Sequence, residues 1–158
     1  MKEFKISDYL NFNLLIIILP VIIGFVIGQL SRPGEWYLKL NKPKLTPPSY
    51  VFGIAWSILY ILIGISYYLA LKDKSFEYWL IPIIHLILNF SYSPMMFIYK
   101  KLFESAIITS LILITAIITL ILFYKYKKII SVVLLIPYII WLCFANYLAW
   151  SIYLLNKN

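Results

Sequence analysis

Long apolar runs alternate with short charged connections along the whole chain. The five runs cover residues 12–31, 49–71, 78–99, 105–124 and 129–155, and none of them contains Asp, Glu, Lys or Arg. A helix needs about 20 apolar residues to cross the hydrocarbon layer of a bilayer, since each residue adds about 1.5 Å. The pattern therefore predicts an all-α protein, an integral membrane bundle of five transmembrane helices.

The connections differ in length and in proline content. Those at 72–77, 100–104 and 125–128 are short, which favours antiparallel neighbours, whereas the connection at 32–48 holds Pro33, Pro43, Pro47 and Pro48. Because proline lacks an N–H and restricts the residue before it, we expect no regular helix there. Two interpretations remain open: a stiff lid over a pocket at one end of the bundle, or a surface connector.

Composition and charge agree with a membrane protein. The chain has 158 residues, 63% hydrophobic and 13% charged, against about 45–50% and 25% in soluble domains. This length is typical of a single domain, here residues 1–158, and the apolar content excludes a soluble enzyme or a disordered chain. The lysines behind the net charge of +8 lie between the runs and at the termini, where they would meet lipid headgroups rather than nucleic acid.

Charge counting gives no membrane orientation. Seven Lys or Arg residues fall on each side of a five-span arrangement, so the positive-inside rule returns a tie. The single cysteine, Cys143, excludes an internal disulfide and a cysteine-based zinc site.

The spans carry little conventional catalytic chemistry. Their one ionisable group with a near-neutral pKa in water is His85, which argues against an ion-coupled pump. No nucleophile stands beside a base, and no carboxylates are paired. Aromatic rings are abundant instead, including Trp56, Trp79, Trp141 and Trp150. We expect a site that binds a flat apolar ligand.

Gly24 and Gly28 form a G-x-x-x-G pattern in the first span. Glycines one turn apart let another helix approach closely. The partner helix is either that of a second copy, which would give a homodimer, or a neighbouring span of the same chain.

His85 and Asn89 lie four residues apart and share a helix face, which Tyr92 and Met96 continue. Lipid would reject the polar groups, so the face should point into the bundle. It forms either the polar part of a ligand pocket or hydrogen bonds that join helices. We assign no metal site; His85 as a haem ligand is the minor alternative to a core histidine with satisfied hydrogen bonds.

Three motifs in order along the chain resemble the TspO/MBR family. The first runs through Glu35-Trp36-Tyr37, Leu40-Asn41-Lys42-Pro43, Thr46-Pro47-Pro48, Val51-Phe52 and Ala55-Trp56. The second is Asn89 with Ser93-Pro94 and Phe97. The third is Pro137-Tyr138 with Trp141, Ala145 and Leu148. The resemblance covers nearly the whole chain.

The resemblance implies a five-helix, usually dimeric, membrane protein with an aromatic pocket closed by the first loop. It implies binding of porphyrins such as protoporphyrin IX and haem, and of sterol-like or benzodiazepine-type ligands, with no required cofactor. Carried over by position, the pocket contains Tyr37, Pro47, Trp56, Asn89, Tyr92, Trp141 and Ala145. Leu45 and Tyr92 stand where many members have tryptophan.

Three functions remain open, of which the resemblance implies the first two. The first is a receptor or carrier for tetrapyrroles with a sensory or stress-regulatory role. The second is light- and oxygen-dependent breakdown of porphyrins, for which the resemblance implicates Trp56 and Trp141. The third is facilitated transport of an apolar metabolite. We expect a multi-pass protein of a prokaryotic cell membrane, because the chain is rich in Ile, Lys and Asn.

Overall fold

The computed structural model describes residues 6–157 and the side chains of residues 14–157, so Lys2 and Lys5 of the orientation count lie outside the described residues. The long elements are α1 (Ile6–Leu30), α3 (Ser49–Leu71), α4 (Leu80–Ser93), α5 (Leu102–Lys125) and α6 (Ile129–Leu155). Three short ones are α2 (Glu35–Lys39), the 3₁₀ helix η1 (Phe76–Trp79) and the π-helix η2 (Pro94–Ile98). Within 6–157 there is no strand.

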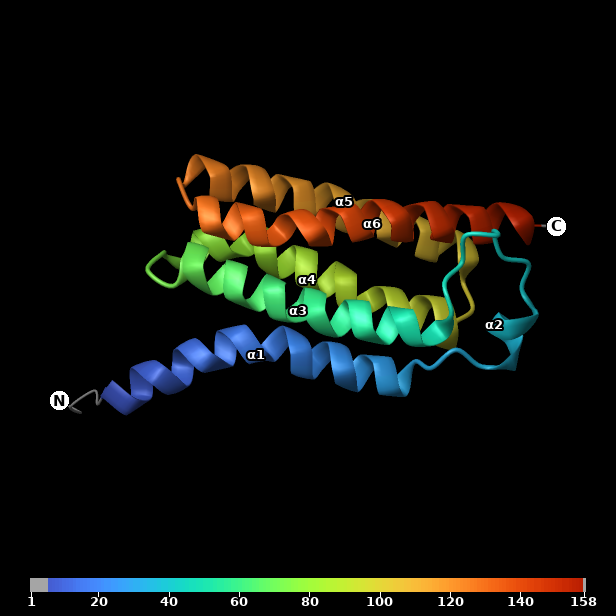
Figure 1. Cartoon of the computed structure of the whole chain (residues 1–158), viewed down its shortest axis with the longest axis horizontal. Coiled ribbons are helices and arrows are strands. Elements are labelled where there is room, and N and C mark those ends of the chain that lie inside the picture. Colours follow the sequence, from blue (N-terminus) through green and yellow to red (C-terminus); the bar gives the residue numbers. More distant parts are fainter. Residues whose placement is uncertain (1–5, 158) are drawn as a thin grey trace.

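The long helices lie side by side in one bundle (Figure 1). Helix α1 packs on α3, α3 on α6, α6 on α5, and α5 on α4, while α4 also touches α1. The short links before and after α5 make it antiparallel to both α4 and α6. The predicted all-α bundle of five spans is confirmed.

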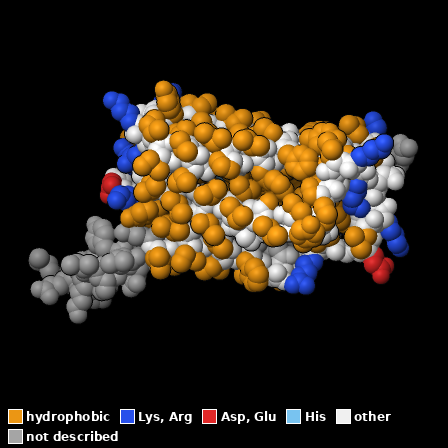
Figure 2. All heavy atoms as spheres, viewed as in Figure 1, with side chains coloured by type: hydrophobic (Ala, Val, Ile, Leu, Met, Phe, Trp, Pro, Cys, Tyr) orange, Lys and Arg blue, Asp and Glu red, His pale blue; other side chains and the backbone are white. Residues whose placement is uncertain are grey.

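Side chains on the bundle surface identify its surroundings. In the described part of the chain, α3, η1–α4–η2, α5 and α6 are each long and apolar enough to cross a membrane, and α1 contributes the shorter apolar stretch Leu14–Leu30. Figure 2 shows charged side chains gathered at the two ends and an apolar face between them. Such a band matches the hydrocarbon layer. The protein is a multi-pass integral membrane protein.

Two segments differ from the sequence prediction for local reasons. The 32–48 connection does contain a helix, the single turn α2, which fits between Pro33 and Pro43. The third span is also not one regular helix. Pro94 has no N–H to continue α4, and the next turn widens so that the Tyr99 N–H donates to the Pro94 carbonyl at 3.0 Å. Such π-turns are often found at functional sites.

Small residues let the helices approach closely. A Cβ at Gly64 of α3 would overlap the Ile17 carbonyl of α1, and a Cβ at Gly24 of α1 would overlap the Tyr60 ring of α3. Gly28, in contrast, has open space where a Cβ would stand. Gly24 therefore serves packing within the chain, and the tightest backbone contact lies at Gly64, which the sequence pattern did not indicate.

We predict that Gly64→Ala lowers the thermal stability of the protein in detergent. The added methyl group must push α1 from α3, and overpacking of this kind costs about 1–3 kcal/mol. Gly53→Ala is the matched control, because a Cβ there meets no atom within 4 Å and alanine favours the helix. An unfolding temperature of Gly64→Ala equal to that of the control would contradict the packing described.

Candidate functional site

A cavity of about 580 Å³ lies in the half of the bundle nearest the 32–48 loop. Every long helix contributes to its wall, together with the loop and η2. Its volume falls within the range of about 300–1,000 Å³ that is usual for small-molecule sites. The wall is mainly apolar and aromatic, formed by Val21, Ile22, Gly24, Phe25, Gly28, Gln29, Ser31, Pro33, Tyr37, Ser49, Phe52, Gly53, Trp56, Ser57, Tyr60, Asn89, Tyr92, Ser93, Phe97, Thr109, Ile112, Leu142, Ala145, Leu148 and Ile152.

The structure brings most of the predicted pocket residues together. The cavity wall includes Tyr37, Trp56, Asn89, Tyr92 and Ala145. They come from the loop and from α3, α4 and α6, so residues far apart in the sequence meet at one place.

Two predicted residues, Pro47 and Trp141, are not part of the wall. Trp141 packs edge-on against Phe52, with ring centres 5.9 Å apart, and it is Phe52 that lines the cavity. The indole N–H of Trp141 is buried without a hydrogen-bond partner among the described residues. Trp141 therefore supports the wall from behind.

The aromatic side of the wall is formed by neighbouring rings of α3. The Trp56 and Tyr60 rings both line the cavity and lie 5.3 Å apart with planes tilted by 31°. Tyr138 meets Trp56 edge-on at 6.2 Å, and Phe90 of α4, which lines the small cavity described below, lies 5.7 Å from Tyr60. Rings supported in this way present a rigid surface to a flat guest.

Polar groups in the wall are few. Tyr60 donates its hydroxyl proton to Asn89 Oδ1 at 2.7 Å, and both residues line the cavity. Ser31, at the end of α1, also lines it; its hydroxyl is buried and has no partner in the described part of the chain. A buried hydroxyl without a partner is costly, so Ser31 Oγ is available to a guest. No sequence pattern pointed to Ser31 beyond its place at the end of a span.

His85 takes part in a buried hydrogen-bond chain. Its Nδ1 lies 2.7 Å from the Tyr67 hydroxyl and its Nε2 lies 2.7 Å from the Tyr138 hydroxyl. Asn89 Nδ2 donates to the same Tyr138 hydroxyl at 2.7 Å. Both ring nitrogens of His85 are thus engaged, its side chain has no exposed surface, and neither nitrogen is free to bind iron.

Hydrogen bonds join five residues of α3, α4 and α6 into what we call the polar chain. In order, these residues are Tyr60, Asn89, Tyr138, His85 and Tyr67. Both sequence interpretations of the His85 face therefore apply: Asn89 reaches the cavity, and the chain also joins helices.

The 32–48 loop covers the end of the large cavity. Pro33 and Tyr37 line the cavity, and the Tyr37 ring meets Phe97 of η2 edge-on at 5.0 Å. Lys42 lies over the Tyr37 ring, 4.7 Å from its centre, and donates to the carbonyls of Leu38 and Leu40 at 3.1 Å. Burial raises the pKa of the Tyr37 phenol above its ordinary value, so this part of the wall stays neutral at physiological pH. Leu45, by contrast, is 67% exposed.

Asn156, just after α6, clamps this loop to the bundle. Its side chain accepts the backbone N–H of Asn41 at 3.0 Å and donates to the Asn41 carbonyl at 2.8 Å. A second donation, to the Ile152 carbonyl at 2.7 Å, holds the amide in place. The sequence patterns did not indicate this contact, because its two residues are 115 positions apart.

The large cavity also reaches the surface of the bundle that faces lipid. Phe25 and Ile22 of α1 line it although they are 66% and 50% exposed. Gly28 and the α3 residue Gly53 line it as well, and both are exposed. These residues lie in membrane-spanning helices, so the opening meets the hydrocarbon layer.

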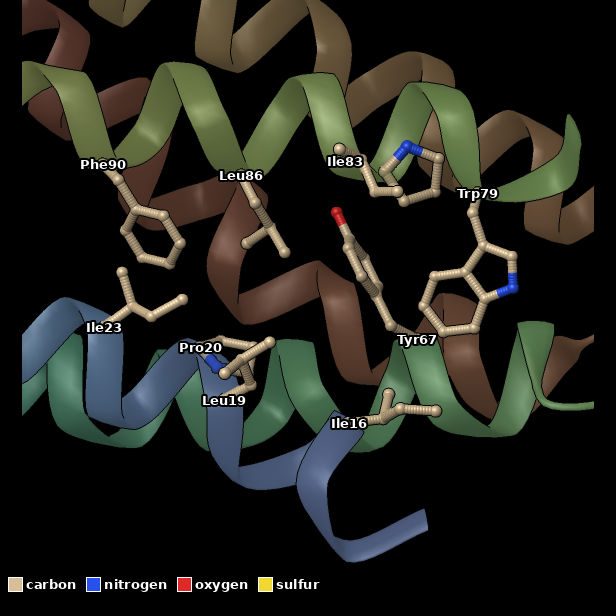
Figure 3. Close-up of a pocket in the computed structure, with 10 residues that line it drawn as sticks. Ile16, Leu19, Pro20, Ile23, Tyr67, Trp79, Ile83, Leu86 and Phe90 are labelled. Carbon is tan, nitrogen blue, oxygen red and sulfur yellow. The ribbon is translucent and has the colours of Figure 1, made fainter. Parts of the chain in front are cut away.

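A second cavity, of about 210 Å³, lies between α1 and α4 in the other half of the bundle. Figure 3 shows the Tyr67 ring rising from α3 toward α4, with Trp79, Leu86 and Phe90 around it. Its walls are almost entirely apolar. Tyr67 connects this small cavity to the polar chain, whose other end, Tyr60, lines the large cavity.

Comparison with known proteins identifies a family. A family model described as TspO/MBR family matches residues 16–155. The tryptophan-rich protein TspO of Bacillus cereus is 36% identical over 137 residues, which cover 84% of this chain and 89% of that protein. The tryptophan-rich sensory protein of Cereibacter sphaeroides is 30% identical and covers 83% of each chain. The human translocator protein is 29% identical over 81% of this chain and 82% of its own length.

We predict that Asn156→Ala loosens the loop. Removing two hydrogen bonds of about 1 kcal/mol each should speed amide hydrogen exchange in peptides covering residues 36–46 by roughly tenfold or more. Asn41→Ala is the control, because Asn41 contributes only backbone groups to the clamp. Equal exchange in both variants would show that Asn156 does not hold the loop.

Proposed function

The chain belongs to the TspO/MBR family, and we propose that it is a membrane receptor or carrier that binds a porphyrin in the large cavity. Protoporphyrin IX and haem are the expected guests, and a sensory or stress-regulatory role the expected purpose. The observation that carries the proposal is the large cavity with an aromatic wall inside a membrane bundle.

The wall matches a flat apolar guest with a few polar groups at its edge. The paired Trp56 and Tyr60 rings offer ring surface, and stacking on aromatic faces adds about 0.5–1.5 kcal/mol per pair beyond area burial. Ala145 leaves room on the opposite wall, from α6. Ser31 Oγ offers an unpaired hydroxyl, which suits a carboxylate or carbonyl of the guest.

Charge at the loop end supports the same class of guest. Arg32 and Lys39 are exposed beside the cavity end, whereas Lys42 is committed to carbonyls of its own loop. Arg32 and Lys39 are therefore the cations that can attract propionate groups, at the modest strength usual for exposed ion pairs.

Homodimerisation, which the family resemblance implies, remains a prediction. Gly24 is occupied by Tyr60 of the same chain, so the G-x-x-x-G pattern as a whole does not offer a free groove. A dimer of this protein would have to use another surface.

We predict that Gly53→Leu abolishes or strongly weakens binding of protoporphyrin IX. The leucine side chain enters open space in the cavity, so the fold should tolerate it while the guest clashes with it. A cost of about 1–3 kcal/mol corresponds to a roughly ten- to hundredfold loss of affinity, measured by absorption titration.

The matched control for this test is Ile54→Leu on the same turn of α3, because Ile54 is 58% exposed on the outer face. It should bind the porphyrin like the unmodified protein. Wild-type affinity in Gly53→Leu, with correct folding, would remove the porphyrin from this cavity.

Light-driven breakdown of the bound porphyrin is the enzymatic alternative. Trp56 lines the cavity, but Trp141 stands behind Phe52, so only one of the two implicated tryptophans can touch a guest. We predict that bound protoporphyrin IX keeps its absorption under illumination in air as long as free porphyrin does. A faster loss with a new product, absent in Trp56→Phe but present in Trp141→Phe, would establish the enzyme instead.

A further inference from the structure

We propose that the protons of the polar chain all point away from the large cavity, so that the Tyr60 hydroxyl acts toward a guest only as a hydrogen-bond acceptor. The cavity then favours flat guests that carry an N–H or O–H group at this wall. The inference rests on the proposed function in one respect: it takes the large cavity as the ligand site.

The hydrogen-bond donors and acceptors of the polar chain can all be paired in only a few ways. Each phenol has one proton, and a neutral imidazole has one N–H and one acceptor nitrogen. Buried polar groups without partners are costly, and the four links of the chain are all 2.7 Å long. Every link is satisfied only if all members donate in the same direction.

The end of the chain near the large cavity indicates that direction. Tyr60 donates its hydroxyl proton to Asn89 Oδ1, and Asn89 Nδ2 donates to the Tyr138 hydroxyl. The Tyr138 oxygen therefore already accepts one hydrogen bond, and its own proton goes to the remaining partner, His85 Nε2, at 2.7 Å.

The proton on His85 follows from this assignment. Because His85 Nε2 accepts the Tyr138 proton, the ring proton stands on Nδ1. The Nδ1–H donates to the Tyr67 hydroxyl oxygen, 2.7 Å away.

The reverse direction contradicts the placement of the Asn89 amide. It would need Asn89 to accept from Tyr138 and to donate to Tyr60, whereas its Nδ2 faces Tyr138 and its Oδ1 faces Tyr60. The Tyr60 proton is therefore used inside the chain.

This arrangement sets the chemistry that the guest meets. Tyr60 lines the large cavity and has only lone pairs left to offer. A guest N–H or O–H at this wall gains a hydrogen bond of about 1 kcal/mol, whereas a guest oxygen faces lone pair against lone pair. Tyr60 is thus a specificity-determining residue, and His85 and Tyr67 are positioning residues that act through it.

Tyr67 allows the direction to be changed from a distance. It lines the small cavity (Figure 3), not the large one. In Tyr67→Phe the Nδ1–H of His85 loses its acceptor, so the proton is better placed on Nε2, donating to Tyr138. The later links then reverse as the Asn89 amide turns over, so that its oxygen accepts from Tyr138 and its NH₂ donates to Tyr60. The Tyr60 proton is released toward the cavity.

The first experiment reads the ring proton by nitrogen NMR on the ¹⁵N-histidine-labelled protein without a histidine tag. His85 is the chain's single histidine, so its two nitrogen signals need no further assignment to a residue. We expect an Nδ1–H form in the unmodified protein and an Nε2–H form in Tyr67→Phe. An Nε2–H form in the unmodified protein overturns the proposed direction, whatever the protein binds.

The second experiment compares carbazole with dibenzofuran, two flat guests of the same shape that differ in an N–H against an ether oxygen. We expect the unmodified protein to bind carbazole about five- to tenfold more tightly. Tyr67→Phe should reverse the preference, and Tyr60→Phe should remove it. Tyr68→Phe is the control, because Tyr68 lies beneath Lys72 outside the polar chain and should leave the preference unchanged.

The outcomes separate the two proposals. Equal preference in the unmodified protein, Tyr67→Phe and Tyr68→Phe overturns the role of Tyr60 even if porphyrin binds. If carbazole, dibenzofuran and protoporphyrin IX all fail to bind, the large cavity is not the ligand site. The His85 nitrogen signals would still decide the direction of the hydrogen bonds in the polar chain.

Discussion

In the hydrocarbon layer no water is present to satisfy a polar side chain, and this constraint orders the bundle. Most buried polar side chains in the described part of the chain find a partner on another helix or on their own backbone, with Ser31 Oγ, Ser131 Oγ and Trp141 Nε1 as exceptions. Ser66 of α3 donates to the Ser131 carbonyl of α6 at 2.8 Å. The indole N–H of Trp150 in α6 donates to the Ser110 hydroxyl of α5, and that hydroxyl donates in turn to Asn146 Oδ1 of α6. The polar chain does the same for α3, α4 and α6, so the groups that lipid rejects are those that join the helices.

The sequence predicted the large-scale structure well because charge and length in a membrane leave few alternatives. Four spans lie within about three residues of their predicted ranges, because charged residues flank the apolar runs, whereas α1 begins at Ile6, six residues before its predicted start, and includes Asp8. The finer features depended on contacts that a linear pattern does not contain. The wide turn at Pro94, the single turn α2 and the tight approach at Gly64 each arise from local backbone geometry.

The candidate site shows the same division. The resemblance placed Tyr37, Trp56, Asn89, Tyr92 and Ala145 at one cavity, and they do line it. It also placed Trp141 there, but Trp141 packs edge-on against Phe52, and Phe52 rather than Trp141 lines the cavity. Ser31 and Asn156 were missed because their roles come from an unpaired hydroxyl and from a pairing across 115 residues.

The exposed residues of α1 and α3 at the large cavity have a consequence for how affinity is measured. An apolar guest dissolves in the bilayer far better than in water, so it approaches Phe25 and Gly53 from the acyl chains. The concentration that governs occupancy is then the amount of guest per lipid molecule. Adding more vesicles to the same amounts of protein and guest would therefore empty the cavity, although the total concentration of guest in the sample stays the same. Binding constants from different detergents or lipids are comparable only after correction for partitioning.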